Sequence, residues 1–197
     1  MNKSMEHLFN PTREIPKGEA VMPIHLRPAE SSDHSFLYEL YTSTRIEEVS
    51  ARGWDILQQQ AFMRMQYRAQ QWQYQGQLTQ IEDYLVLDGE EPVGRLLISH
   101  EKGYIHLADI ALLAPYREKG IGTDLIHALQ AKAARSRKAV RLNVPKLSRA
   151  ASLFVRLGFK VIGEQGPLLE MEWQPPSSKL RVVKRGRTSQ SRNSKGI

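Results

Sequence analysis

Two glycines and two basic side chains lie close together in the segment Arg117-Glu118-Lys119-Gly120-Ile121-Gly122-Thr123. The apolar run before this segment, Tyr104 to Leu113, is typical of a strand, and the run after it, Asp124 to Ala134, has the apolar spacing of a helix. Backbone N–H groups at the start of a helix have no partner within the helix and carry the positive end of its dipole. Because glycines let an anion approach such groups closely, the segment predicts a phosphate-binding loop.

Two ionisable side chains, His106 and Asp109, interrupt the strand that precedes this loop. A carboxylate in an otherwise apolar strand needs a partner or a function, and a histidine with a pKa of about 6.5 can accept a proton at neutral pH. A regular strand points two residues three positions apart to opposite faces, so only a β-bulge turns both to one side. Each is an alternative candidate for a general base. The structural alternatives are an exposed histidine and a carboxylate that fixes a bulge.

The pattern Arg-x-x-Gly-x-Gly between a strand and a helix resembles the acetyl-coenzyme A signature of the GCN5-related N-acetyltransferases, the GNAT family. A P-loop signature is absent from the sequence, and a dinucleotide-binding loop would need a third glycine where Leu125 stands. Further along, the strand-like residues 139–144 precede the segment Ser148 to Phe159, which ends in Leu-Gly-Phe. That segment is similar to the family's Asn-x-Ala-x-x-Leu-Tyr-x-x-x-Gly-Phe.

The resemblance extends over about residues 21–174. Ile24 to Ala29 followed by Asp33 resembles the family's first strand and first helix, with Asp33 as the predicted N-cap, and residues 83–99 resemble its central hairpin. The family implies an α+β fold, a mixed and mostly antiparallel sheet flanked by helices in a single domain. Residues 1–20 are then a flexible N-terminal segment, and residues 175–197 form a basic, disordered tail.

The resemblance also implies a site for acetyl-CoA as cosubstrate, with no metal. Backbone amides of the strand, near Leu112 and Leu113, would hold the pantetheine arm and the thioester carbonyl, and Ser148 stands where the family often has an asparagine. The family's acid, a tyrosine, is replaced by Phe154. The cofactor-binding residues implied are Leu112, Leu113, Arg117, Glu118, Lys119, Gly120, Ile121, Gly122, Thr123 and Ser148.

The function implied is acetyl transfer from acetyl-CoA to a primary amine of a small molecule or a protein. The alternative is a catalytically silent acyl-CoA-binding module that senses or scaffolds, which Phe154 and Ser148 favour. The sequence names neither the acceptor nor the oligomeric state.

Charge and composition add one further alternative. The net charge of +7 equals the seven basic residues that follow Pro176, so the rest of the chain is neutral overall. Such a tail is expected to stay solvated, or to contact nucleic acid or an acidic partner. The sequence has no cysteine, signal-like segment or membrane-length apolar run, which indicates a cytoplasmic protein without membrane contact.

The glutamine-rich stretch from Trp54 to Gln80 carries an apolar stripe of helical spacing, made of Phe62, Met65, Ala69 and Trp72. It predicts a helix that covers the core with this stripe. In the family, early helices border the acceptor pocket, so Trp54, Tyr67, Trp72 and Tyr74 are candidates to line it.

Overall fold

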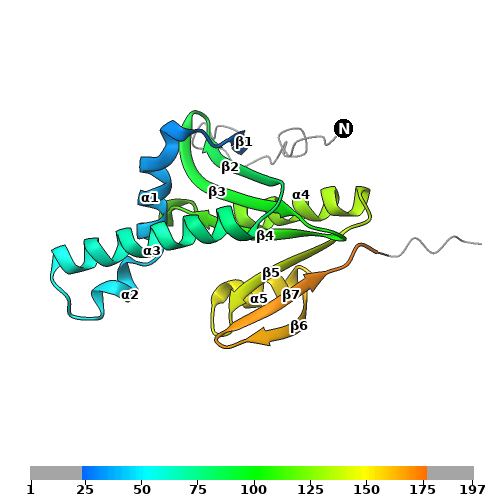
Figure 1. Ribbon diagram of the computed structural model, residues 1–197. Helices are drawn as coiled ribbons and strands as arrows, with labels where there is room; N and C mark the ends of the chain where they lie inside the picture. The colour runs from blue at the N-terminus through cyan, green and yellow to red at the C-terminus, as the bar shows by residue number, and fades with distance from the viewer. Residues whose placement is uncertain (1–23, 177–197) are drawn as a thin grey trace, which may run out of the picture.

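The computed structural model describes residues 24–176, so the predictions for residues 1–20 and for the basic tail beyond Pro176 lie outside the described residues. Seven strands form one sheet in the order β1-β2-β3-β4-β5-β7-β6 (Figure 1). Every neighbouring pair is antiparallel except β4 and β5, which are parallel. The strands are β1 (Ile24–Pro28), β2 (Ile81–Asp88), β3 (Glu91–His100), β4 (Tyr104–Leu112), β5 (Ala139–Pro145), β6 (Lys160–Gln165) and β7 (Leu168–Trp173). The predicted α+β fold with a mixed, mostly antiparallel sheet is confirmed.

Helices pack on both faces of the sheet. The α-helices are α1 (His34–Ser43), α2 (Ile46–Ser50), α3 (Ile56–Gln77), α4 (Ile121–Arg135) and α5 (Arg149–Arg156), and the short 3-10 turns are η2 (Ser31–Asp33) and η3 (Ala114–Tyr116). α1 and α3 pack on one face with β2 side chains, and α4 and α5 contribute to the core on the other. None of the helices in residues 24–176 has both the length and the apolar content needed to cross a bilayer.

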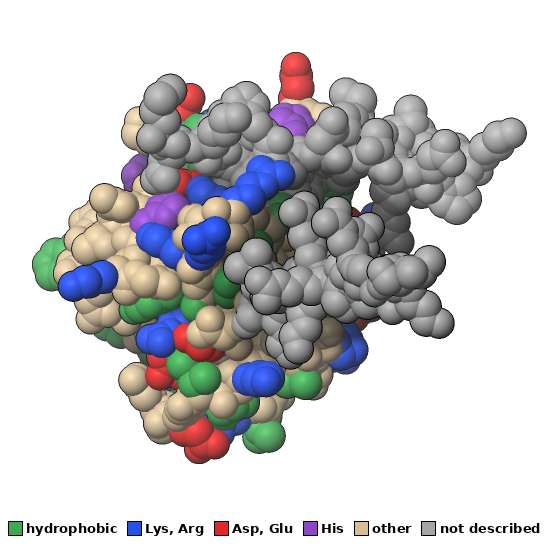
Figure 2. All heavy atoms as spheres, turned by 90° about the vertical axis from the view of Figure 1, so that its right-hand side faces the viewer, with side chains coloured by type: hydrophobic (Ala, Val, Ile, Leu, Met, Phe, Trp, Pro, Cys, Tyr) green, Lys and Arg blue, Asp and Glu red, His purple; other side chains and the backbone are tan. Residues whose placement is uncertain are grey.

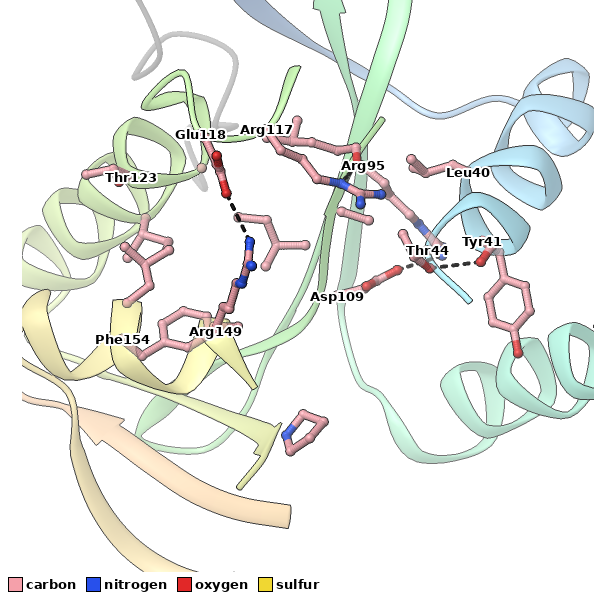
Figure 3. Close-up of a pocket in the computed structure, with 18 of the residues that line it drawn as sticks. Leu40, Tyr41, Thr44, Arg95, Asp109, Arg117, Glu118, Thr123, Arg149 and Phe154 are labelled. Carbon is pink, nitrogen blue, oxygen red and sulfur yellow. Dashed lines mark hydrogen bonds and ion pairs between the residues drawn. The ribbon is translucent and has the colours of Figure 1, made fainter. Parts of the chain in front are cut away.

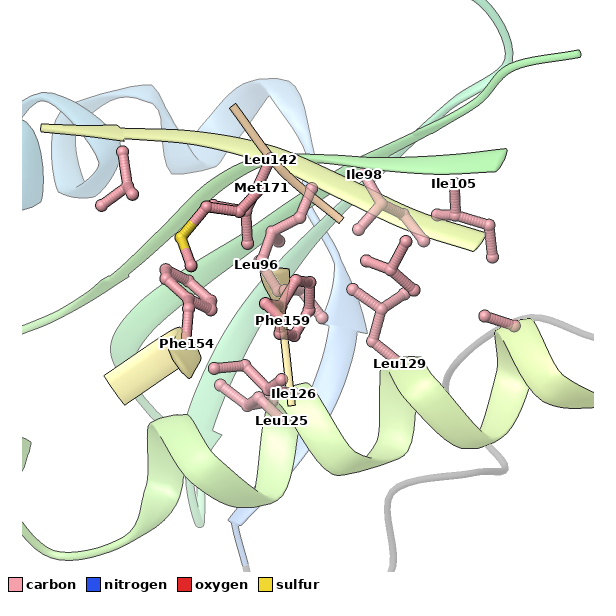
Figure 4. Close-up of a cluster of buried hydrophobic side chains, with 14 of the residues drawn as sticks. Leu96, Ile98, Ile105, Leu125, Ile126, Leu129, Leu142, Phe154, Phe159 and Met171 are labelled. Atoms are coloured by element: carbon pink, nitrogen blue, oxygen red, sulfur yellow. The ribbon is translucent and has the colours of Figure 1, made fainter. Parts of the chain in front are cut away.

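The main core lies between α4, α5 and the sheet. Leu125, Ile126 and Leu129 of α4 are at most 1% exposed and face the strands (Figure 4). Their spacing of one, three and four positions places them on one side of the helix, as the sequence predicts. The sheet contributes Leu96, Ile98, Ile105, Leu142 and Met171, and Phe154 and Phe159 close the end of the core near α5. This packing fixes the start of α4 relative to the end of β4.

The pairing of β4 changes half-way along the strand. β4 pairs with β5 only from Tyr104 to Leu107, and beyond this point the two strands separate. At the same place a β-bulge interrupts the pairing of β4 with β3, because Leu97 lies opposite Asp109 while Ile98 lies opposite Leu107. The second half of β4 therefore has one paired edge, toward β3, and one open edge.

A polar cluster ties α4 to the sheet within the same core region. The Glu82 carboxylate of β2 accepts hydrogen bonds from Lys132 Nζ of α4 at 2.8 Å and from Tyr84 at 2.9 Å, and it lies 2.6 Å from His100 Nε2. The Lys132 and His100 side chains are at most 9% exposed. A carboxylate this deep in the structure is stable because several donors replace its water.

The two predictions about the first helices are confirmed in part. α3 forms as predicted, but Trp72 and Met65 of the predicted buried stripe are 79% and 56% exposed, and the buried residue of the helix is Met63. Tyr67, one turn after Met63, packs against Tyr38 and Tyr41 of α1. Asp33 is the N-cap residue of α1, as predicted, but its carboxylate makes no cap bond, because Arg27 holds it through two hydrogen bonds of 2.9 and 3.1 Å.

Charges on the folded part are mixed. In Figure 2 basic and acidic side chains lie interspersed over the described part of the face shown, as the neutral sum for the chain before the tail leads one to expect.

Candidate functional site

A cleft of ≈ 1250 Å³ opens where β4 and β5 separate. One end is lined by the start of α4 and by α5, and the other by α1, the turn after it and α3 (Figure 3). The middle of the floor is the second half of β4, from Asp109 to Leu112. The lining residues that the sequence predicted are Asp109, Leu112, Arg117, Glu118, Gly120, Gly122 and Thr123.

The loop end of the cleft has the geometry of an anion site. Gly120 is the N-cap of α4 and has a φ of 86°, a left-handed conformation that glycine adopts without strain. Asp124 N donates to Gly120 O at 3.0 Å as the first i to i−4 bond of the helix, so the N–H groups of the residues between them precede the intrahelical ladder. A Cβ built on Gly122 has nothing within 4 Å, so the space in front of this turn is open.

Arginine side chains surround this loop. Arg117 Nε donates to the Leu112 carbonyl at 2.7 Å, which fixes the loop against the end of β4. Arg149 and Arg156 of α5 line the same end of the cleft, and Arg149 is 97% exposed with a 3.2 Å contact to Glu118 (Figure 3). Exposed pairs of this kind are weak, so Arg149 is free to exchange Glu118 for another anion.

The open edge of β4 directs backbone groups into the cleft. The Leu113 amide donates to Val93 O at 2.9 Å, so this residue is bonded into the sheet on the β3 side. Successive residues of a strand point to alternate sides, and the Leu112 carbonyl indeed faces the other way, toward Arg117. The Leu112 and Ile110 amides therefore point toward the open edge, where the Ile110 amide also interacts with the Asp109 carboxyl. The Leu113 amide, also predicted for the cofactor, is already used.

The other end of the floor holds a charge cluster around one buried arginine. Arg95 of β3, only 5% exposed, binds Asp83 of β2 through two hydrogen bonds of 2.8 and 2.7 Å. The same guanidinium lies 3.5 Å from the Asp109 carboxylate and 5.6 Å from the centre of the Tyr74 ring on α3. One arginine thus lies between two carboxylates, of which Asp109 is the one that lines the cleft.

Burial controls the protonation of this cluster. Burial raises the pKa of the Asp109 carboxyl above its usual value, and the charge of Arg95 opposes this rise only in part. The pKa of the Tyr74 hydroxyl is raised for the same reason, loss of water around the ionised form. Asp109 is consequently a carboxylate that binds a proton more readily than an exposed one.

The bulge places His106 and Asp109 on the same side of the sheet, since they lie opposite Ser99 and Leu97, two positions apart on β3. His106 nevertheless lies outside the lining of the cleft, and burial lowers its pKa. Asp109 is the candidate of the two that reaches the cavity.

Other predicted residues have structural tasks. Ser148 is the N-cap of α5, where its hydroxyl accepts from Ala151 N at 3.2 Å and donates to Pro145 O at 2.8 Å. Lys119 Nζ lies 5.4 Å from the Tyr116 ring, and Ile121 packs against the core. Like Leu113, these three lie outside the cleft lining within residues 24–176. Phe154 is 4% exposed, lines the cleft and packs edge-on against Phe159 at 5.3 Å.

Sequence reasoning did not find Arg95, Arg45 or Gln70, which all line the cleft. A signal existed for Arg95, because it is a charged residue in an apolar strand, as Asp109 is. For Arg45 and Gln70 the sequence offers no such contrast, since both lie in polar surroundings. The four aromatic residues predicted to line the acceptor pocket, Trp54, Tyr67, Trp72 and Tyr74, lie outside the lining of this cleft.

A family model described as the acetyltransferase (GNAT) domain matches residues 80–161, from the start of β2 to the start of β6. Residues 80–161 thus match a GNAT acetyltransferase domain. This match contains the loop, the open edge of β4 and α5, and it confirms the resemblance seen in the sequence. Among curated proteins, none matches the sequence significantly.

Solved structures share the fold of this GNAT domain. The PaiA N-acetyltransferase of Thermoplasma acidophilum, crystallised with coenzyme A, superposes with a TM-score of 0.59 at 21% identity, over 78% of this chain and 99% of that chain. An acetyltransferase of Thermus thermophilus gives 0.57 at 18% identity over 77% and 96% of the two chains. The ribosomal-protein-S18-alanine N-acetyltransferase of Escherichia coli gives 0.53 at 14% identity over 77% and 93%. At such identities the likeness establishes the fold.

Proposed function

We propose that this GNAT domain transfers an acetyl group from acetyl-CoA to a primary amine. The observation that carries the proposal is the continuity of one cleft, which joins the first turn of α4, the open edge of β4 and the Asp109 carboxylate. An anion site alone suits many phosphorylated ligands. An anion site that leads past the open edge of a strand to a half-buried carboxylate suits a phosphorylated thioester and an amine that attacks it.

The residues of the loop end fit coenzyme A. Its pyrophosphate would lie against the N–H groups of Ile121, Gly122 and Thr123, where the helix dipole and Arg117 favour negative charge. The Leu112 amide, on the open edge of β4, would bind the extended pantetheine arm as a neighbouring strand would. The start of α4 is thereby assigned to binding, and the bulged half of β4 to positioning of the thioester.

Asp109 is the proposed general base. The amine nitrogen attacks the thioester carbonyl carbon, the C–N bond forms, and the C–S bond breaks. The proton lost by the amine passes to the Asp109 carboxylate, whose raised pKa makes it a better acceptor than an exposed aspartate. Arg95, which is held by Asp83, keeps the Asp109 carboxylate in place once Asp109 has released this proton.

The thiolate would leave beside Phe154, which has no proton to donate. This does not prevent the reaction, because a thiol with a pKa near 8.5 is a tolerable leaving group without an acid. It does favour a second candidate function, a silent acyl-CoA-binding module.

A thiol-release assay with acetyl-CoA and a panel of primary amines tests the proposal. We expect amine-dependent release of free coenzyme A, a loss of at least about a hundredfold in Asp109→Asn, and little change in the matched variant His106→Gln. Acetyl-CoA binding without thiol release from any amine would support the silent module. Equal activity in Asp109→Asn and the parent would remove Asp109 from the mechanism.

A further inference from the structure

The end of the cleft that is lined by α1, the turn after it and α3, here called the acceptor end, contains an arginine that forms no ion pair with the described residues. Arg45, in the turn between α1 and α2, lines the cavity, and its guanidinium lies 4.0 Å above the Tyr41 ring. Its hydrogen bonds are to neutral oxygens, Thr44 Oγ1 at 2.9 Å and the Tyr41 carbonyl at 3.4 Å. Within residues 24–176 no carboxylate lies close enough to form an ion pair with it, whereas Arg95 and Arg27 each have one within 3 Å.

Arg45 lines the same cleft as the proposed base, Asp109. Burial raises the pKa of the Asp109 carboxyl, and the charges of Arg95 and, after it, Arg45 oppose this rise. The Arg45 guanidinium and the Asp109 carboxylate therefore both border the same cavity, into which an acceptor would bind.

An unpartnered acceptor lies on the same side. Gln70 of α3 lines the cleft, and its Oε1 atom is buried without a hydrogen-bond partner among the described residues. A buried polar atom without a partner costs about 1–3 kcal/mol, so such an atom in a ligand cavity indicates a donor supplied by the ligand.

These groups are complementary to a zwitterion. Resting on the proposed function, we infer that the acceptor is a free amino acid, with its carboxylate on Arg45 and its amine between Gln70 Oε1 and the Asp109 carboxylate. An arginine fork matches a carboxylate with two parallel hydrogen bonds, and a carboxylate and an amide oxygen together accept two N–H groups. The N-terminus of a protein would present an amide to Arg45 in place of this anion and would leave the cation unpaired. Arg45 therefore favours an acceptor that carries a carboxylate close to its reacting amine.

The test compares free amino acids with their methyl esters, which keep the amine and remove the negative charge. For the parent protein we expect kcat/KM for at least one free amino acid to exceed that for its ester. In Arg45→Gln the ratio of acid to ester should fall about tenfold or more, through a rise in KM for the acid alone. The amine of an acid and that of its ester differ in pKa, but this difference is the same for every variant and cancels when the acid-to-ester ratios of two proteins are compared. Arg45→Lys keeps the positive charge but loses the two parallel donors of the guanidinium. Its acid-to-ester ratio should lie between the ratio of the parent and that of Arg45→Gln.

Arg52→Gln is the matched control. Arg52 also stacks on aromatic rings, those of Trp54 and Phe62, but lies outside the cleft lining and pairs with Glu48. It should leave the acid-to-ester ratio unchanged.

The outcomes separate this inference from the proposed function. Thiol release with esters, simple alkylamines or peptide N-termini, but with no preference for free acids, would overturn the inference and keep the acetyltransferase. An equal loss for acid and ester in Arg45→Gln would also overturn it, because Arg45 would then only support the fold. Failure of acetyl-CoA to bind would instead contradict the proposed function.

Discussion

Replacement of Gly94 by alanine places a methyl group where β4 already lies. A Cβ at this position of β3 would be 2.5 Å from the Ala111 carbonyl oxygen and 2.6 Å from Leu112 Cδ2. Ordinary contacts are about 3.5 Å, so the second half of β4 must move by about 1 Å or the strands must separate. Overpacking of this kind costs about 1–3 kcal/mol of unfolding free energy.

For a domain of this size, that cost corresponds to a Tm lower by about 2–12 °C. Thermal and urea unfolding of Gly94→Ala would measure it. The matched control is Gly76→Ala on α3, where a Cβ has nothing within 4 Å and alanine should raise helix stability by up to about 1 kcal/mol. Because the displaced residues carry the open edge of β4, Gly94→Ala should also bind acetyl-CoA more weakly. An unchanged Tm would refute the close packing of β3 on β4 from which this reasoning starts.

Three other changes have distinct expected effects. Glu82→Gln should lower the unfolding free energy by about 3–5 kcal/mol by leaving Lys132 unpaired. Burial raises the pKa of the Glu82 carboxyl, but its hydrogen bonds outweigh burial, so the folded-state pKa is lowered. The stability that Glu82 contributes is therefore fully present above its unfolded pKa of about 4.3 and is lost as the pH falls through the folded-state pKa. Urea unfolding measured at a series of pH values would show this loss. Asp109 has the opposite sign: its raised pKa means that the parent loses stability relative to Asp109→Asn as pH rises from about 3.9 through the folded pKa, measurable in the same titrations. Arg149→Gln should leave Tm unchanged, because its contact with Glu118 is exposed, yet weaken acetyl-CoA binding with a smaller salt dependence in a titration series.

The sequence predicted the fold and the loop because both depend on local pattern. Glycine is required at Gly120 by a positive φ, and the apolar spacing of α4 after it defines the helix whose first turn is the proposed anion site. Residues 80–161, which the family model matches, are also those where strand and helix patterns are regular. The sequence also indicates that His106 and Asp109, three positions apart, can lie on the same side of the sheet only if a bulge separates them, and β4 has such a bulge.

The acceptor end could not be predicted in the same way. Hydrophobic spacing predicts that Met65 and Trp72 lie on the buried side of α3, but both are exposed. The side that is buried packs Met63 against Tyr41 and Val49, and further along the helix places Tyr74 over the Arg95 guanidinium. A buried charge that is covered by an amphipathic side chain leaves no signal in the apolar spacing of the helix. Ser148 shows a related limit, because a position in a family motif does not reveal that the hydroxyl is used to cap a helix.

The most direct test of the central claim, that the first turn of α4 holds the phosphates of acetyl-CoA, is isothermal titration of the parent, Gly122→Glu and Gly76→Glu with acetyl-CoA. Gly122 has open space in front of it, and an acidic side chain at a helix start favours folding by about 0.3–1 kcal/mol, so Gly122→Glu should fold normally. We expect binding by the parent and by Gly76→Glu, and a loss of at least about a hundredfold in affinity for Gly122→Glu, whose carboxylate takes the place of the phosphates. Equal affinity in all three proteins would show that the phosphates bind elsewhere.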